Sequence, residues 1–253
     1  MSSAFSSMHH KVRRLLLWLL LASGLMLTNT ALADTRSDSV TGSDIGRIIH
    51  LSGVMGISDQ VRQLALSDDQ TDQEQRRRLR TLVGWAPVAL EQRYQNVLNG
   101  YSEAELATLL DLLQSPLMQR ARDAEALALS EQDSAAYEAY MERLQEQPPA
   151  KARRQRIELI LNRNGMWQWM LKARASVPTS EAIAEPEQIR LLAEHFLLYA
   201  YRGMDNHSLD ELNRLWAQPA LQRWLNDAYH ALPPSDTVYE QKSPDSDQVS
   251  TSD

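Results

Sequence analysis

Four arginines in one short run are the side chains best suited to electrostatic recognition. They are Arg76, Arg77, Arg78 and Arg80. Consecutive arginines cover a wide arc of a helix, so they form a basic patch rather than a strip. Such a patch suits an acidic partner or an anionic surface, whereas the alternative is a solvated face that pairs with nearby acids. A second basic run, over 151–156, leaves the same two interpretations open.

An aromatic cluster offers a different kind of contact. Trp167 and Trp169 flank a glutamine and precede Met170. One helix cannot bury all three on a single side, so we expect one tryptophan to be exposed or to line a groove for a peptide or helix. Packing between helices is the alternative. The candidate partner-binding residues are therefore Arg76, Arg77, Arg78, Arg80, Trp167 and Trp169.

Catalytic and metal-binding patterns are missing from the sequence. It has no cysteine, no G-x-S-x-G and no H-E-x-x-H, and its nine glycines form no phosphate loop. Asp68 and Asp69 have polar neighbours and are typical of solvated charges. We predict no catalytic residue, no cofactor and no metal site. An enzyme that gathers carboxylates from distant helices remains an alternative.

The N-terminal region has the features of a secretory signal peptide. Three basic residues precede a thirteen-residue apolar run over 15–27, and Ala31-Leu32-Ala33 supplies an A-x-A site. The run is shorter than the roughly 20 residues that a membrane-spanning helix needs. We predict a signal peptide over 1–33 that is cleaved to leave no stable membrane anchor; an uncleaved anchor is the alternative. The expected compartment is the bacterial periplasm.

Charge and composition describe the exported chain. Cleavage leaves 23 basic against 33 acidic residues, a net charge of −10, which argues against nucleic acid as a partner. Residues 34–43 are expected to be a flexible leader. Residues 233–253 are rich in serine, aspartate and proline, and they predict a disordered acidic tail because they offer little apolar surface to bury.

The clearest helical pattern lies after Gly100. Ser102 and Glu105 form a capping box, and leucines follow at helical spacing until Pro116 breaks the helix. Gly100 is expected to end the preceding helix in the left-handed conformation. Ser208 and Glu211 predict a second capping box, again followed by a proline.

Several features recur in the same order along the chain. The segments over 112–120 and 215–223 are similar, and the stripe ending in Ser52-Gly53 matches the stripe ending in Asn164-Gly165. Each glycine implies a helix break or a close helix approach. The pattern predicts duplicated modules over 44–147 and 151–232, joined by a linker over 148–150. General similarity between amphipathic helices is the alternative explanation.

The expected fold is all-α, an array of about eight helices in which two pseudo-repeated modules share a core. No alternating strand pattern occurs. Each module alone would be small, which favours a common interface over independent domains.

The segment over 101–120 resembles the bacterial family known as domain of unknown function 2059. Ser102, Glu105, Leu106 and Ser115-Pro116 match its "s-x-x-E-L … S-P" pattern. The second copy matches less well, with Gln218 in place of the serine. The resemblance implies a periplasmic helical domain and transfers no activity or functional residue.

These observations favour a non-catalytic periplasmic protein, an adaptor or chaperone-like scaffold with a protein partner. The alternatives are an uncharacterised hydrolase with a carboxylate-based site and a peripheral envelope-binding module that uses the arginine patches. The sequence leaves the oligomeric state open.

Overall fold

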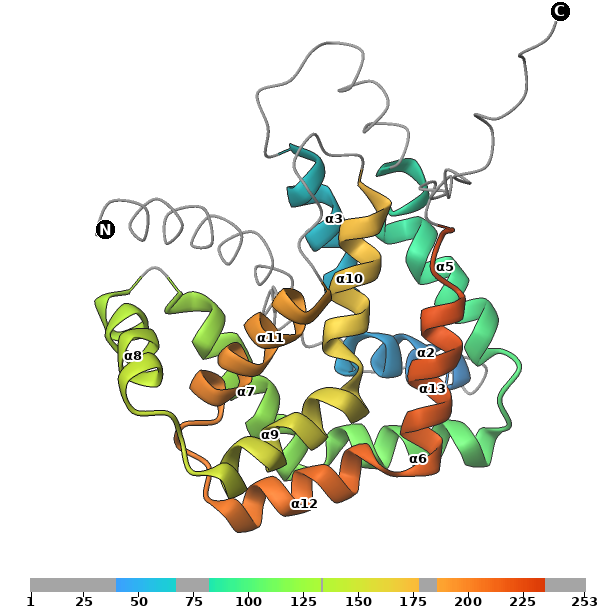
Figure 1. Ribbon diagram of the computed structural model, residues 1–253. Helices are drawn as coiled ribbons and strands as arrows, with labels where there is room; N and C mark the ends of the chain where they lie inside the picture. Colours follow the sequence, from blue (N-terminus) through green and yellow to red (C-terminus); the bar gives the residue numbers. More distant parts are fainter. Residues whose placement is uncertain (1–39, 67–81, 133, 178–185, 235–253) are drawn as a thin grey trace, which may run out of the picture.

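The computed structural model describes residues 40–66, 82–132, 134–177 and 186–234, and these are mostly helical (Figure 1). No strand occurs within these ranges, so the predicted all-α class is confirmed. The predicted signal peptide, the start of the predicted leader and the predicted tail from residue 235 lie outside the described residues. Helix α2 begins at Val40, so the last four residues of the expected flexible leader are helical instead.

The helices divide into two groups in chain order. The first group comprises α2 (Val40–Leu51), α3 (Gly56–Leu66), α5 (Pro87–Leu98), α6 (Glu103–Gln114), α7 (Pro116–Ser130) and α8 (Ala135–Glu146). After the non-helical residues 147–150, the second group comprises α9 (Lys151–Asn164), α10 (Met166–Ser176), α11 (Pro186–Ala200), α12 (Asn206–Trp216) and α13 (Pro219–His230).

The described residues hold eleven such helices rather than about eight, because short breaks divide several predicted helices. Gly53 (φ 72°) and Gly165 (φ 69°) adopt the left-handed conformation that glycine tolerates without a steric penalty. Each therefore ends one helix and turns the chain directly into the next. Of the two expected reasons for these glycines, the helix break is correct.

Helix α6 begins as predicted. Ser102 accepts a hydrogen bond from the Glu105 amide, and the Glu105 carboxylate accepts one from the Ser102 amide at 2.8 Å. Pro116 starts α7 directly after the C-cap Ser115. The predicted left-handed conformation of Gly100 was wrong, because Gly100 is not among the described glycines with positive φ. Helix α5 instead ends at Asn99 in the right-handed region.

The second predicted capping box was also wrong. Helix α12 begins at Asn206, and its N-cap is Asp205, which accepts a hydrogen bond from the Ser208 amide at 2.7 Å. An aspartate three residues earlier offers an equally good cap and adds a favourable charge at the positive end of the helix. Glu211 lies one turn further on, where it pairs with His207. The predicted break at Pro219 is correct.

The two groups of helices pack in a reciprocal way (Figure 1). Helix α2 contacts α5 and α6, as α9 contacts α11 and α12. Helix α7 of the first group packs against α11 and α12 of the second group. Its counterpart α13 packs against α5 and α6 of the first, while α3 and α10 contact each other. Helices α7 and α13 therefore each pack against helices of the other group.

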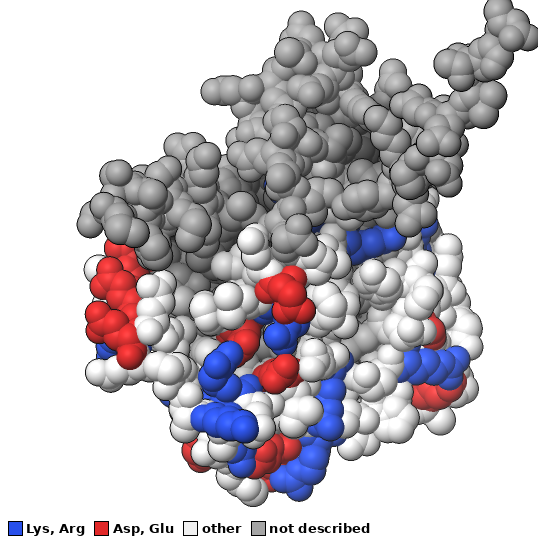
Figure 2. All heavy atoms as spheres, viewed as in Figure 1, with Lys and Arg blue, Asp and Glu red and all other residues white. Residues whose placement is uncertain are grey.

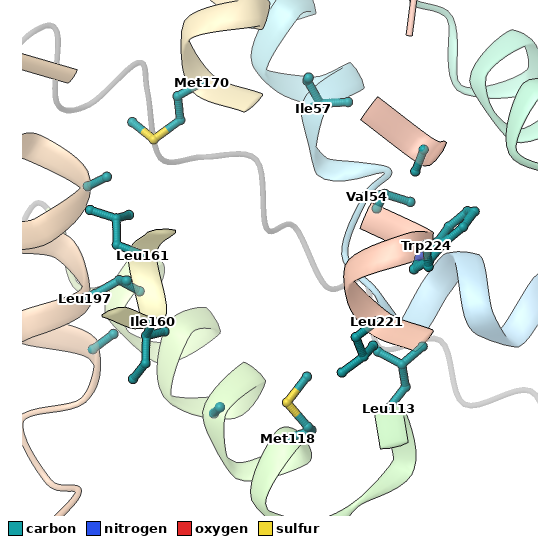
Figure 3. Close-up of a cluster of buried hydrophobic side chains, with 14 of the residues drawn as sticks. Val54, Ile57, Leu113, Met118, Ile160, Leu161, Met170, Leu197, Leu221 and Trp224 are labelled. Atoms are coloured by element: carbon teal, nitrogen blue, oxygen red, sulfur yellow. The ribbon is translucent and has the colours of Figure 1, made fainter. Parts of the chain in front are cut away.

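One apolar core joins both groups (Figure 3). Leu113 and Met118 from α6 and α7 lie in the same buried cluster as Ile160, Leu197 and other side chains of the second group. Trp224 is fully buried and meets Tyr94 edge to face, with ring centroids 5.9 Å apart. Burial of this kind supplies most of the stability of a helical fold, so the groups form a single folding unit.

In each group a side chain bridges the carbonyls at two helix ends. The Arg122 guanidinium donates to the Leu51 carbonyl at 3.2 Å and to the Leu113 carbonyl at 2.9 Å. The equivalent carbonyls of the second group, those of Arg163 and Trp216, accept from the Gln222 amide at 2.8 and 2.6 Å. Both bridges satisfy carbonyls at the C-terminal ends of two helices. They therefore hold the end of α2 to the end of α6, and the end of α9 to the end of α12.

Candidate functional site: a cavity between the two helical groups

The structure places only part of the predicted site. Arg76, Arg77, Arg78 and Arg80 lie outside the described residues. Trp167 and Trp169 are both half-buried on α10, whereas Met170 is fully buried. Both tryptophans pack against the core, and neither is fully exposed.

The second basic run holds helices together. Arg153 donates to the carbonyls of Met204 and Tyr201 at 3.0 and 2.6 Å, beyond the end of α11. Arg154 pairs with the buried Glu194 at 2.9 Å. Figure 2 shows basic and acidic side chains interleaved over the part of the surface where α9 and α12 lie. Of the two predicted roles of this run, the structure supports pairing with nearby acids.

Arg156 makes the most specific of these pairs. It forms a two-pronged contact with Asp210 of α12, with distances of 2.8 and 3.0 Å. A planar guanidinium matches a carboxylate in this geometry, so the pair sets the register between α9 and α12. These arginines serve the interface between helices.

A cavity of about 250 Å³ opens where the two helical groups meet. The turn between α2 and α3 forms one side, and the turn between α9 and α10 forms another. These are the two turns made by the left-handed glycines. Trp169 lines the cavity, whereas Trp167 does not.

The apolar part of the cavity wall is unusually rich in sulfur and indole. Its thioether and aromatic members are Met55, Met118, Met166, Met170, Trp169, Trp216 and Phe196. Methionine side chains are unbranched and polarisable, so they adapt to ligands of different shape. The indole N–H of Trp216 is buried and makes no hydrogen bond to any described residue. This wall suits an apolar guest.

A polar patch from α7 completes the wall. Arg122 and Glu125 both line the cavity. The Tyr201 hydroxyl donates to the Glu125 carboxyl group. Burial raises the pKa of Glu125, and this effect outweighs the opposing influence of the Tyr201 hydrogen bond and of Arg122. Burial also lowers the pKa of Arg122. The carboxyl group therefore holds a proton more readily than an exposed glutamate would.

A shallow, more polar hollow adjoins the cavity. Its lining includes Arg47 of α2 together with Gln114 and Gln119, from the end of α6 and the start of α7. His50 and Leu51 line both the cavity and the hollow, so the two share a wall. The combined site offers an apolar compartment beside a compartment with hydrogen-bond donors.

No protein-family model, no curated protein and no solved structure matches this chain. The site must therefore be interpreted from its own residues.

The sequence signal for this site was present but indirect. The recurring glycines mark the two turns that flank the cavity, yet the helix contacts that bring them together are long-range.

The described residues contain no cluster of three or more histidine, cysteine, aspartate or glutamate side chains arranged to hold a metal. Within the same residues, no helix is long and apolar enough to span a bilayer.

Proposed function

We propose that this protein is a non-catalytic helical binding protein of the bacterial periplasm, an adaptor or chaperone-like scaffold for a polypeptide partner. The observation that carries the proposal is the methionine- and tryptophan-lined cavity between the two helical groups. Adaptable methionine surfaces suit partners that present varied apolar side chains. The basic n-region, apolar run and A-x-A site of the first 33 residues support the compartment.

The duplication of the chain is part of this proposal, as is its resemblance to the domain of unknown function 2059. The matched left-handed glycines, the matched carbonyl bridges and the reciprocal packing of α7 and α13 support the duplication. A duplicated scaffold places its recognition site where its halves join, and the cavity lies there.

Site-specific photocrosslinking in the periplasm tests the proposal. A photoreactive residue at His50, which is exposed and lies on the cavity wall, is expected to trap a polypeptide partner. The control position is Glu142, which is exposed on the peripheral helix α8. The crosslink should disappear when Met55→Trp fills the cavity, and it should persist with Met141→Trp on α8. Equal trapping at both positions, or no effect of Met55→Trp, would contradict the proposal.

A second candidate function, that of a hydrolase, has one observation in its favour. Asp59 and Glu125 both line the cavity, and a carboxyl group with a raised pKa can act as a general acid. The Tyr201 hydroxyl already donates a hydrogen bond to the Glu125 carboxyl group, which weakens the interpretation of Glu125 as a general acid. Hydrolysis of peptidoglycan or peptide substrates by the pure protein, lost in both Asp59→Asn and Glu125→Gln, would establish the enzyme and reject the adaptor.

A further inference from the structure

The cavity and its adjoining hollow differ in chemistry, and this difference defines a ligand. The cavity is mainly apolar, whereas the hollow presents Arg47, His50 and the side-chain amides of Gln114 and Gln119. No carboxylate belongs to the described lining of the hollow. The described lining of the hollow therefore carries one permanent charge, the positive charge of Arg47, although the chain as a whole is acidic.

The charges around the hollow favour an anion. Arg47 is half-exposed and pairs with Asp44 at 3.2 Å one turn earlier on α2. An exposed pair of this type contributes little stability, so a ligand can compete for the guanidinium. The first turn of α7, which carries Gln119, contains no acidic residue, so it adds no carboxylate that would repel an anion.

The shared wall limits the distance between the apolar and anionic parts of the ligand. Because His50 and Leu51 border both compartments, the anion must lie close to the group that enters the cavity. The last residue of a polypeptide satisfies this condition, since its α-carboxylate and its side chain are attached to the same Cα.

We propose that the site binds the C-terminus of a partner polypeptide that ends in an apolar residue, with the side chain in the cavity and the carboxylate at Arg47 and His50. This inference rests on the proposed function and specifies its partner. Arg47 provides charge, while His50 and Gln119 provide hydrogen-bond donors at the mouth of the cavity. The indole of Trp216 and the methionines accommodate the side chain.

Fluorescence anisotropy with labelled pentapeptides tests the inference on the full secreted chain. The first peptide ends in leucine with a free carboxylate, and the second is its carboxamide. The third is a carboxamide with aspartate before the final leucine. The free acid should bind at least tenfold more tightly than the carboxamide. Replacement of the final leucine by glycine should abolish binding of the free acid.

Variants of exposed residues connect the effect to the hollow. Arg47→Gln combined with His50→Gln should reduce the affinity for the free acid to that for the carboxamide, and it should leave the carboxamide unchanged. Arg214→Gln, an exposed arginine on α12, is the matched control and should change neither affinity.

The outcomes separate the two proposals. Equal binding of acid and carboxamide, or binding of the aspartate peptide as tight as that of the acid, would overturn the C-terminal inference. The photocrosslink at His50 would then still support an apolar partner. If no peptide binds while the crosslink persists, the C-terminal inference also fails. Loss of both signals rejects the proposed function.

Discussion

The two helical groups show similar helix contacts, but they use different side chains at their helix ends and in the core. Arg122 bridges two helix ends in the first group, and the neutral Gln222 does so in the second. Helix α6 begins with a serine capping box, whereas α12 begins with an aspartate cap. At another matched pair, the first group has Ala121 where the second has the fully buried Trp224.

This comparison separates what the backbone requires from what the side chains may vary. Left-handed glycines and helix-breaking prolines recur unchanged, because few other residues adopt those conformations. Caps and bridges need only a suitable donor or acceptor, so several residue types can serve. Both groups contribute side chains to one core, so a larger side chain from one group can fill space that a smaller side chain of the other leaves.

The largest expected effect concerns this unequal core. Trp224→Ala should lower the free energy of unfolding by about 3–5 kcal/mol, because it removes a fully buried indole and leaves a cavity. Chemical denaturation monitored by circular dichroism measures the loss. Trp167→Ala is the control, and it should cost much less because Trp167 is half-buried. Equal losses would contradict the expectation that the more deeply buried indole contributes more to stability.

The two carbonyl bridges should differ in strength. Arg122→Met should cost roughly 1.5–3 kcal/mol, since hydrogen bonds from a charged donor are the stronger kind. Gln222→Met removes the neutral bridge and should cost about 0.5–1.5 kcal/mol. Denaturation curves of both variants give the comparison. A larger loss for Gln222→Met than for Arg122→Met would contradict the expectation that the charged donor makes the stronger bridge.

The matched glycines provide a third comparison. Gly53→Ala and Gly165→Ala should each cost roughly 1–2 kcal/mol, because a side chain is strained at positive φ. The loss should be greater at Gly165, where an added Cβ would lie 3.2 Å from the Trp169 indole nitrogen, than at Gly53, where it meets nothing within 4 Å. Thermal and chemical unfolding check the order. Gly46→Ala, inside α2, should be neutral or stabilising.

The helix caps give the smallest expected effects and test a corrected prediction. Ser102→Ala and Asp205→Ala should each cost about 1 kcal/mol, as the loss of an N-cap usually does. Ser208→Ala should cost less than Asp205→Ala, because the Ser208 backbone amide that donates to the Asp205 carboxylate remains in the variant. If Ser208→Ala were as costly as Asp205→Ala, the helix would begin where the sequence pattern placed it.

Most of the local structure could be predicted from the sequence. The stripe of leucines in α6, the capping box at Ser102 and the helix breaks at Pro116 and Pro219 depend on neighbouring residues alone. Local competition explains the errors. Asp205 and Ser208 both suit an N-cap, and the helix begins at the earlier of the two. Gly100 permits a left-handed turn but does not require one.

The candidate site was harder to predict because its residues come from distant helices. Trp169 was selected from its local cluster, yet Met55, Met118 and Trp216 carry no sequence pattern that separates a cavity wall from a packed core. Only the long-range contacts between the groups bring these side chains together. The basic residues Arg153, Arg154 and Arg156 suggested a surface patch, but their acceptors lie 40 to 54 residues later in the chain, on α11, on α12 and in the turn between them.

The reciprocal placement of α7 and α13 determines the order in which the molecule can assemble. Tyr101 donates to Asp227, a partner 126 residues later, and Arg93 donates to the carbonyl of Ala231. The faces of α5 and α6 therefore stay uncovered until the final helix, α13, packs against them. A chain interrupted before residue 219 would expose the faces of α5 and α6 that α13 normally covers, which makes it a natural target for proteolysis. Fragments produced separately over 34–147 and 151–253 are expected to remain largely unfolded alone and to regain helicity on mixing.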